Sequence, residues 1–242
     1  MTNETLLKEG LYRVSSVYHK QLLLGANFIR DQDGWIRAER FTEPEDETQK
    51  TIASVGLSDI SHLGKFSLKS NDIIESIDKE LGGKVHTEPH VAFMSNSELL
   101  RDSLVCVLTN DEALIISRKS DSKIISKHLG QGEIECFHVT DLTSYFTGLY
   151  LIGPKSREVL SKVTEVNVNP DVFPNFAVSQ LPLFHVQSIL LRHDIRNVLA
   201  FQIYFDRGFG EYLWDKIMYS GKEFGITSIG SSALKLLGWN WN

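Results

Sequence analysis

The hydrophobic and polar positions follow the same order in two parts of the chain. In each part a polar turn leads into a short apolar strand, and a helix follows. In the first helix Ile73, Ile74 and Ile77 recur at helical spacing, and two glycines after Leu81 end the pattern. The first part has the turn at Asp59-Ile60-Ser61, the strand Lys65–Lys69 and the helix Asp72–Leu81; the second has the turn at Asp141-Leu142-Thr143, the strand Gly148–Ile152 and the helix Lys155–Val163.

A hairpin followed by a helix is also predicted twice. The two β-prone runs of each hairpin bracket a polar segment, as hairpin strands do. The first unit has strands Leu104–Leu108 and Ala113–Ser117 and the helix Ser122–Leu129; the second has strands Ser188–Arg192 and Ala200–Phe205 and the helix Gly210–Tyr219. The whole order repeats after about eighty residues, which predicts an α+β fold of two pseudo-repeated halves. Their mixed or antiparallel sheets would carry helices on one face, with 1–50 as an N-terminal extension packing on the core, 51–135 as the first half and 136–242 as the second.

Ser58, Asp59, Ser61 and His62 gather in one short stretch and have the residue types of a nucleophilic site. A catalytic triad, however, is assembled by the fold and not by adjacency along the chain. The same Asp, branched aliphatic residue and hydroxyl residue recur from Asp141 onward, without the histidine. We therefore interpret both stretches as structural turns, in which side chains satisfy backbone N–H groups.

Composition and charge narrow the function classes. Of the 242 residues 42% are hydrophobic and 23% charged, which is typical of a soluble globular protein. A net charge of −6 without a basic block argues against nucleic acid as a partner. Cys106 and Cys136 lie 30 residues apart without a C-x-x-C motif, which argues against a redox pair or a zinc site. Without a signal peptide or an apolar run of about 20 residues, the sequence predicts a cytoplasmic protein with no membrane span.

Two further segments have alternative interpretations. His86, Glu88 and His90 alternate as strand ligands of a metal would, but Pro89 favours a loop and no further ligand lies nearby, so no metal is predicted. Near the end of the chain Trp239 and Trp241 would either bind a groove of another protein or fold back onto their own core.

Several blocks of the sequence resemble, in the same order, the N-terminal region of the glycine-cleavage T protein (aminomethyltransferase) and its folate-enzyme relatives. The blocks are His19–Leu22, Gly25–Phe28, Asp33–Trp35, Val55–Lys65, Leu151–Leu160, Phe201–Phe205, Gly210–Asp215, Glu223–Gly225 and Ile229-Gly230. The resemblance covers most of the chain. It implies a two-halved α+β region that cradles tetrahydrofolate, with the C-terminal barrel of the family absent from this sequence.

The resemblance also implies the site residues and shows where they depart from the family. Asp102 remains from an Asp-Asp pair and would be the catalytic carboxylate, while Ser117 begins the segment that replaces an Asn-rich turn. Gln202 stands where an acidic residue would hold the pterin, and an amide offers one acceptor and an unwanted donor in its place. Arg192 and Tyr204 complete the implied cofactor-binding set. Later Arg and Glu positions of the family fall on Ser232, Gly238 and Asn240.

The second half is also similar to the gamma subunit of heterotetrameric sarcosine oxidase. The similarity is carried by Asp171–Pro174, by Arg192 and Asp194, and by Tyr204, Arg207 and Tyr212–Trp214. We favour a gamma-type subunit of a tetrahydrofolate-linked sarcosine or amine oxidase or demethylase, with little or no catalysis of its own. Its partner would be a larger flavoprotein or folate-enzyme subunit, contacted through the tail tryptophans. The alternatives are a reduced tetrahydrofolate-dependent aminomethyltransferase that uses Asp102, and a stand-alone folate-fold assembly or regulatory protein.

Overall fold

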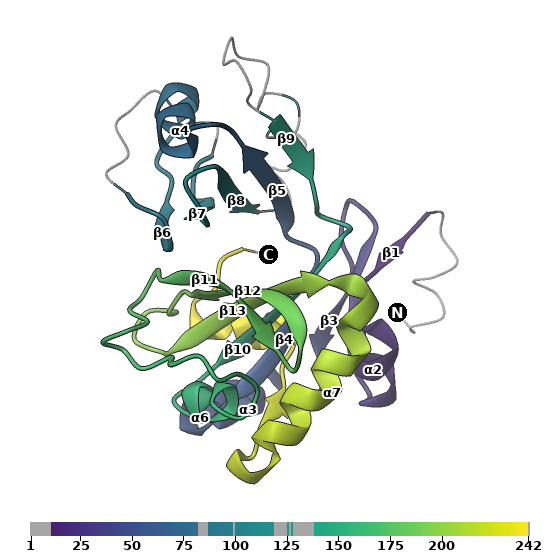
Figure 1. Cartoon of the computed structure of the whole chain (residues 1–242). Coiled ribbons are helices and arrows are strands. Elements are labelled where there is room, and N and C mark those ends of the chain that lie inside the picture. The colour runs from purple at the N-terminus through teal and green to yellow at the C-terminus, as the bar shows by residue number, and fades with distance from the viewer. Residues whose placement is uncertain are drawn as a thin grey trace.

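The strands of this computed structural model form three sheets (Figure 1). The structure describes residues 11–81, 87–98, 100–118, 125, 127 and 138–241. The small sheet has the order β1-β3-β2, with β1 at Arg13–Val14, β3 at Trp35–Arg40 and β2 at Asn27–Arg30. The six-stranded sheet has the order β11-β12-β13-β10-β4-β14, with these strands at Val178–Leu183, Val186–Arg192, Ala200–Asp206, Phe146–Ile152, Gly56–Asp59 and Thr227–Ser228. The five-stranded sheet has the order β6-β7-β8-β5-β9, with these strands at Val91–Met94, Leu104–Val107, Glu112–Ser117, Gly64–Lys69 and His138–Asp141.

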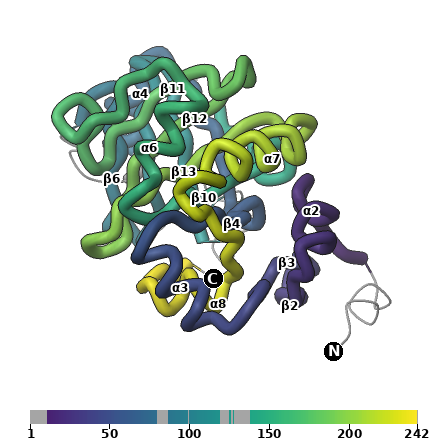
Figure 2. Tube along the Cα trace, turned by 90° about the horizontal axis from the view of Figure 1, so that it is seen from below, coloured from purple at the N-terminus to yellow at the C-terminus, as the bar shows by residue number. Residues whose placement is uncertain are grey.

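Helices cover the outer faces of the two larger sheets. The α-helices are α2 (Tyr18–Leu23), α3 (Pro44–Ala53), α4 (Ile73–Leu81), α6 (Ser156–Leu160), α7 (Gly210–Gly221) and α8 (Ser231–Leu237), and the 3-10 turns η1 (Arg207–Phe209) and η2 (Lys222–Phe224) flank α7. Apolar residues of α6 and α7 share one cluster with the six-stranded sheet, and those of α4 share another with the five-stranded sheet. Figure 2 shows α3 and α8 side by side, next to the N-terminal sheet.

The predicted repeat is confirmed by the order of the strands. Strands β5, β8, β7 and β6 pair in the same antiparallel sequence as β10, β13, β12 and β11. The leading strand of each half, however, pairs with the other half: β4 lies against β10, and β9 lies against β5. The two halves therefore exchange a strand, which no local pattern of the sequence shows. Helix α6 is shorter than the predicted Lys155–Val163, and the predicted helix Ser122–Leu129 lies largely outside the described residues.

The repeated polar segments are structural turns, as the sequence predicts. The backbone N–H of Ser61 donates to Asp59 Oδ1 at 2.9 Å, and that of Thr143 donates to Asp141 Oδ1 at 2.8 Å. Ser61 Oγ also lies 2.5 Å from Asp59 Oδ1, so the hydroxyl of the supposed nucleophile is bound to this carboxylate. The first stretch is a turn that closes the end of β4.

The two turns stabilise each other's halves. Ser61 Oγ accepts the backbone N–H of Gly148 at the start of β10, at 3.1 Å. Thr143 Oγ1 accepts the backbone N–H of Lys65 at the start of β5, also at 3.1 Å. Buried backbone groups need a partner, and these hydroxyls supply it where the chain crosses between the sheets. The exchanged strands are thus fixed by a pair of equivalent hydrogen bonds.

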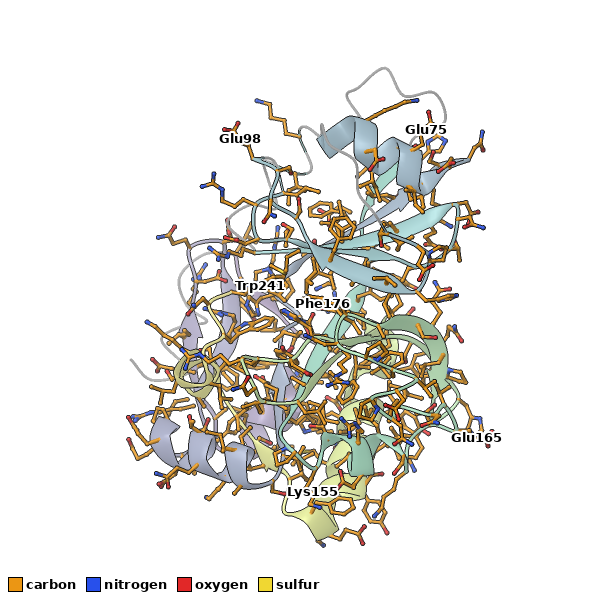
Figure 3. All side chains as sticks on the ribbon, turned by 90° about the vertical axis from the view of Figure 1, so that its left-hand side faces the viewer. Glu75, Glu98, Lys155, Glu165, Phe176 and Trp241 are labelled. Carbon is orange, nitrogen blue, oxygen red and sulfur yellow. The ribbon has the colours of Figure 1, made fainter. Side chains whose placement is uncertain are left out.

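The largest apolar cluster contains residues of both larger sheets and of the C-terminal segment. Leu104, Ile116, Tyr150 and Tyr204 are among its members. In Figure 3 the labelled Trp241 and Phe176 lie between the upper sheet and the lower body. The described part of the chain contains no helix with the length and apolar character needed to span a membrane.

Candidate functional site: a closed polar network between the sheets

Gln202 on β13 lies at the centre of a buried polar network. Its side chain is 0% exposed, and its Oε1 accepts the hydroxyl of Tyr204 at 2.5 Å. Its Nε2 lies 3.1 Å from Nδ1 of His193, and since an amide nitrogen only donates, that ring nitrogen accepts. The Tyr150 hydroxyl donates to the His193 carbonyl at 2.6 Å. Both polar groups of the amide are therefore satisfied within the fold.

The ionisable members of this network are neutral at physiological pH. Burial lowers the pKa of His193 to about 4, with Asp194 opposing the shift. Burial also raises the pKa of the Tyr150 and Tyr204 hydroxyls. A neutral imidazole with Nδ1 as acceptor carries its proton on Nε2, so the bond from Gln202 determines the tautomer.

The two tail tryptophans cover this network from the side of α8. Trp239 is 3% and Trp241 6% exposed, and their ring centroids are 5.1 Å apart. Trp239 meets Tyr150 edge-on at 4.7 Å, and Trp241 lies 6.0 Å from the His193 ring. Of the two interpretations of this segment, folding back onto the core is the arrangement in the structure. A partner contact through these rings would require them to leave the core.

The resemblance implies that the residue at position 202 binds a pterin, and the chemistry of a glutamine does not match that ligand. A pterin presents paired donors that a carboxylate accepts, whereas Gln202 presents one acceptor and one donor. Both are already bonded, and no surface of the side chain is exposed. A pterin bonded to this amide would compete with Tyr204 and His193 for it.

The predicted catalytic carboxylate lies elsewhere, at the turn before β7. Asp102 accepts Nη2 of Arg118 at 3.1 Å, and the two side chains are 48% and 35% exposed. Its φ of 58° places it in the left-handed region, which aspartate tolerates better than most residues. Ser117 beside Arg118 is fully buried, and its Oγ has no hydrogen-bond partner among the described residues. Asp102 forms an ion pair with Arg118, which compensates the charge of the carboxylate.

The guanidinium of Arg192 is also used in hydrogen bonds within the fold. Its Nε and Nη2 donate to the two carboxylate oxygens of Asp194 at 3.1 and 2.8 Å, and its Nη1 donates to the Phe173 carbonyl at 3.0 Å. Such a two-point pairing holds the hairpin tip. Of the predicted cofactor-binding residues the structure therefore brings together Gln202 and Tyr204. Tyr150 and His193 were missed, because the pairing of β10 with β13 places Tyr150 opposite Gln202 and the hairpin tip after β12 brings His193 to it.

A second buried polar group lies on β5. Lys65 is 0% exposed, and its Nζ donates to the carbonyls of Ser61 and Leu63 at 2.7 and 2.9 Å. Burial lowers its pKa to about 7, with Asp59 and Asp141 opposing the shift. The Lys65 side chain therefore binds the turn between β4 and β5, and it has no exposed surface for a ligand.

Metal and thiol chemistry receive no support from the described residues. They contain no group of three or more His, Cys, Asp or Glu that could hold a metal ion. Glu88 and His90 are exposed, and His86 lies outside the described residues. Cys106 is buried and burial raises the pKa of its thiol, which makes it unreactive; Cys136 lies outside the description.

The two halves with their exchanged strands define an α+β fold, and the comparisons show its family. The chain belongs to the GCVT N-terminal domain family, whose model matches residues 17–239. The aminomethyltransferase of Caldanaerobacter subterraneus subsp. tengcongensis is 24% identical over 240 residues, which cover 95% of this chain and 61% of that protein. The human mitochondrial dimethylglycine dehydrogenase is 26% identical over 214 residues, covering 83% of this chain and 24% of that protein. The chain thus spans less than two thirds of these relatives.

Two solved structures share the fold. The glycine cleavage system aminomethyltransferase T from Bartonella henselae has a TM-score of 0.75 at 18% identity, covering 92% of this chain and 61% of that one. The heterotetrameric sarcosine oxidase from Corynebacterium sp. U-96 has a TM-score of 0.61 at 18% identity, covering 88% of this chain and 96% of the matched chain. The predicted α+β fold and the resemblance to both groups are confirmed. The sheets of the described residues include no closed barrel.

Proposed function

We propose that this chain is a gamma-type subunit of a tetrahydrofolate-linked sarcosine or amine oxidase or demethylase, with little or no catalysis of its own. The closed network at Gln202 is the observation that carries the proposal. Its amide is bonded to Tyr204 and His193 and is fully buried, so the position that would hold a pterin is used for packing. In this proposal the folate and flavin chemistry belong to the partner subunits.

The fold of one chain of a multi-subunit enzyme supports a subunit role. The alignment covers 96% of the matched chain of the heterotetrameric sarcosine oxidase, against 61% of the Bartonella aminomethyltransferase. Nearly all of the fold of that sarcosine oxidase chain is thus found in this chain. The likeness at 18% identity is one of fold, and the role is our inference from it.

The N-terminal surface offers a contact for a larger partner. Leu22, Leu23 and Leu24 at the end of α2 are 40%, 84% and 50% exposed, and Leu11 is 97% exposed. Clustered exposed leucines are unusual on a chain that works alone, and such patches mark interaction sites. Helix α2 is itself held to the body, since Lys20 pairs with Asp215 on α7 at 2.6 Å. The leucines would thus be presented on a fixed support.

Purification from the native organism tests the proposal. The tagged chain should co-elute with flavin absorbance in constant ratio on size exclusion. Leu23→Asp should abolish that co-elution, and Val172→Asp, at a 61% exposed apolar residue of a loop, should preserve it. Elution of the wild-type chain alone would refute the subunit role and leave the reduced transferase and the assembly or regulatory protein as candidates.

One observation favours the reduced transferase as a second candidate. Asp102 is half exposed and has a left-handed backbone, and strained residues gather at functional sites. A transferase would need this carboxylate released from Arg118 to stabilise a cationic centre. One-carbon transfer by the isolated chain that is lost in Asp102→Asn would establish this candidate, whereas unchanged turnover in the variant would exclude it.

A further inference from the structure

A cavity of about 400 Å³ lies between the two larger sheets, at the end where the chain crosses from β9 to β10. Its walls come mostly from β5 and β8 of one sheet, from β12 and β13 of the other, and from the crossing segment 142–146. Figure 1 shows these two sheets one above the other. Of the Gln202 network only Tyr204 lines the cavity. Its volume lies in the range of about 300–1,000 Å³ in which proteins bind small molecules, so it is a second candidate site.

The alternation of side chains along two strands turns a carboxylate of each sheet toward this cavity. On β8 Leu114 belongs to the apolar cluster shared by the two sheets, and Glu112 lies two residues before it on the same face. On β13 Tyr204 belongs to the same cluster, and Asp206 lies two residues after it on that face. Both acids line the cavity. The apolar core between the sheets therefore ends in an acidic opening.

Asp206 is hydrogen-bonded to neutral groups. Its Oδ1 accepts the backbone N–H of Gly208 at 2.7 Å, and the Tyr145 hydroxyl donates to its carboxylate, which raises the pKa of the phenol. The neighbouring Arg207 does not line the cavity, and its Nη1 donates to the Ser144 carbonyl at 3.2 Å. These bonds fix the position of the carboxylate and leave its negative charge at the cavity.

Glu112 adds a second, partly compensated charge. Its Oε1 accepts the hydroxyl of Ser67, another residue of the lining, at 3.4 Å. The same oxygen lies 3.8 Å from Nζ of Lys69, whose side chain is 63% exposed, so water weakens this ion pair. None of the described residues that line the cavity is a lysine, an arginine or a histidine. The potential in the cavity therefore favours a positively charged ligand.

Aromatic rings surround the opening beside the acids. Tyr145 is 49% and Phe209 48% exposed, and both line the cavity. Phe146 also lines it, and its ring meets that of Tyr145 edge-on with the centroids 5.0 Å apart. The face of an aromatic ring attracts a cation and also contacts apolar groups. Rings next to carboxylates thus suit a ligand that joins a positive charge to an apolar body.

We propose that this cavity binds a small organic cation, in which an ammonium group is attached to an apolar body. The ammonium would pair with Asp206, while Leu108 and Ile189 contact the apolar body. An amino acid zwitterion suits the cavity less well, because its carboxylate would be repelled by Asp206 and Glu112. A metal ion is not favoured either, since the described residues contain no group of three or more His, Cys, Asp or Glu that could hold one. The inference goes beyond the proposed subunit role and depends on neither folate nor flavin.

The backbone amide of Gly208 gives a direct test in the ¹⁵N-labelled full chain, because its N–H donates to Asp206. Benzylammonium chloride is the probe, and benzyl alcohol is its uncharged counterpart of similar shape. Benzylammonium should shift the Gly208 resonance saturably, because it changes the charge around the acceptor of this bond. Benzyl alcohol at the same concentrations should leave the resonance in place.

Calorimetry on charge-neutral variants tests the role of the carboxylates. Asp206→Asn keeps an oxygen for the Gly208 N–H, and asparagine serves in such turns as well as aspartate does. This variant should weaken benzylammonium binding by roughly tenfold, which is the size of a lost charge-assisted hydrogen bond. Glu112→Gln should weaken binding less, because Lys69 already compensates part of that charge. The control Asp171→Asn, at an exposed acid outside the cavity, should bind as the wild type does.

Three outcomes would overturn the proposal. They are a Gly208 resonance that benzylammonium does not move, a resonance that benzyl alcohol moves equally, and wild-type affinity in Asp206→Asn. A shift by magnesium chloride at lower concentration than by benzylammonium would overturn the assignment to an organic cation. If Asp206→Asn does not fold, wild-type affinity in Glu112→Gln would likewise contradict the proposal. Co-elution with a flavoprotein is a separate readout, so either proposal can fail without the other.

Discussion

Replacing Lys65 by methionine should remove a pH dependence of stability that the wild-type fold contains. The ammonium has no exposed surface, and burial lowers its pKa from 10.5 to about 7. Between these two values the unfolded chain binds a proton that the folded chain does not, so stability rises with pH. From these two pKa values, the free energy of unfolding should increase by roughly 3 kcal/mol between about pH 7 and about pH 9.5.

Urea denaturation followed by circular dichroism measures this gain. Methionine has a similar length and no charge, and it leaves the carbonyls of Ser61 and Leu63 without their donor. That loss lowers stability by about 1–3 kcal/mol at every pH and does not affect the slope. The free-energy difference between wild type and variant should therefore change by roughly 3 kcal/mol over the pH range. A constant difference, as expected for the control Lys69→Met at a 63% exposed lysine of the same strand, would refute the reasoning.

Three further changes test the strand exchange and the Asp102 turn. Ser61→Ala removes the acceptor of the Gly148 N–H and should destabilise the fold by about 2–4 kcal/mol in urea denaturation; a loss below about 1 kcal/mol would contradict the role of this turn. Thr143→Val removes one equivalent bond and should cost less, about 1–2 kcal/mol, and a larger loss than in Ser61→Ala would reverse the predicted order. Asp102→Asn breaks a half-exposed ion pair with Arg118 and should cost at most about 1 kcal/mol; a larger loss would show that the pair holds the fold.

The sequence was most informative for turns and hairpins, whose structure is determined by residues that are close together along the chain. The recurring Asp and hydroxyl residues predicted the two turns, and the same side chains make the predicted bonds to backbone N–H groups. Hairpin patterns placed β7, β8, β12 and β13 within a few residues. Such elements depend on neighbours in the chain, which a single sequence displays.

Contacts between distant segments were beyond the sequence. The exchange of β4 and β9 follows from pairing across the two halves, and nothing in either strand specifies its partner. The bond of Gln202 to Tyr204 joins two residues of one strand, whereas its bond to His193 depends on the hairpin tip before β13. Resemblance pointed to Gln202 as a pterin ligand, and the fold adds that both polar groups of its amide are bonded to Tyr204 and His193.

Calorimetric titration of the purified chain with tetrahydrofolate tests the central claim most directly. The closed network of Gln202, Tyr204 and His193, covered by the tail tryptophans, predicts no binding heat at millimolar ligand. Saturable binding in the micromolar range that Gln202→Ala abolishes would contradict the account, since the network would then open to admit the pterin.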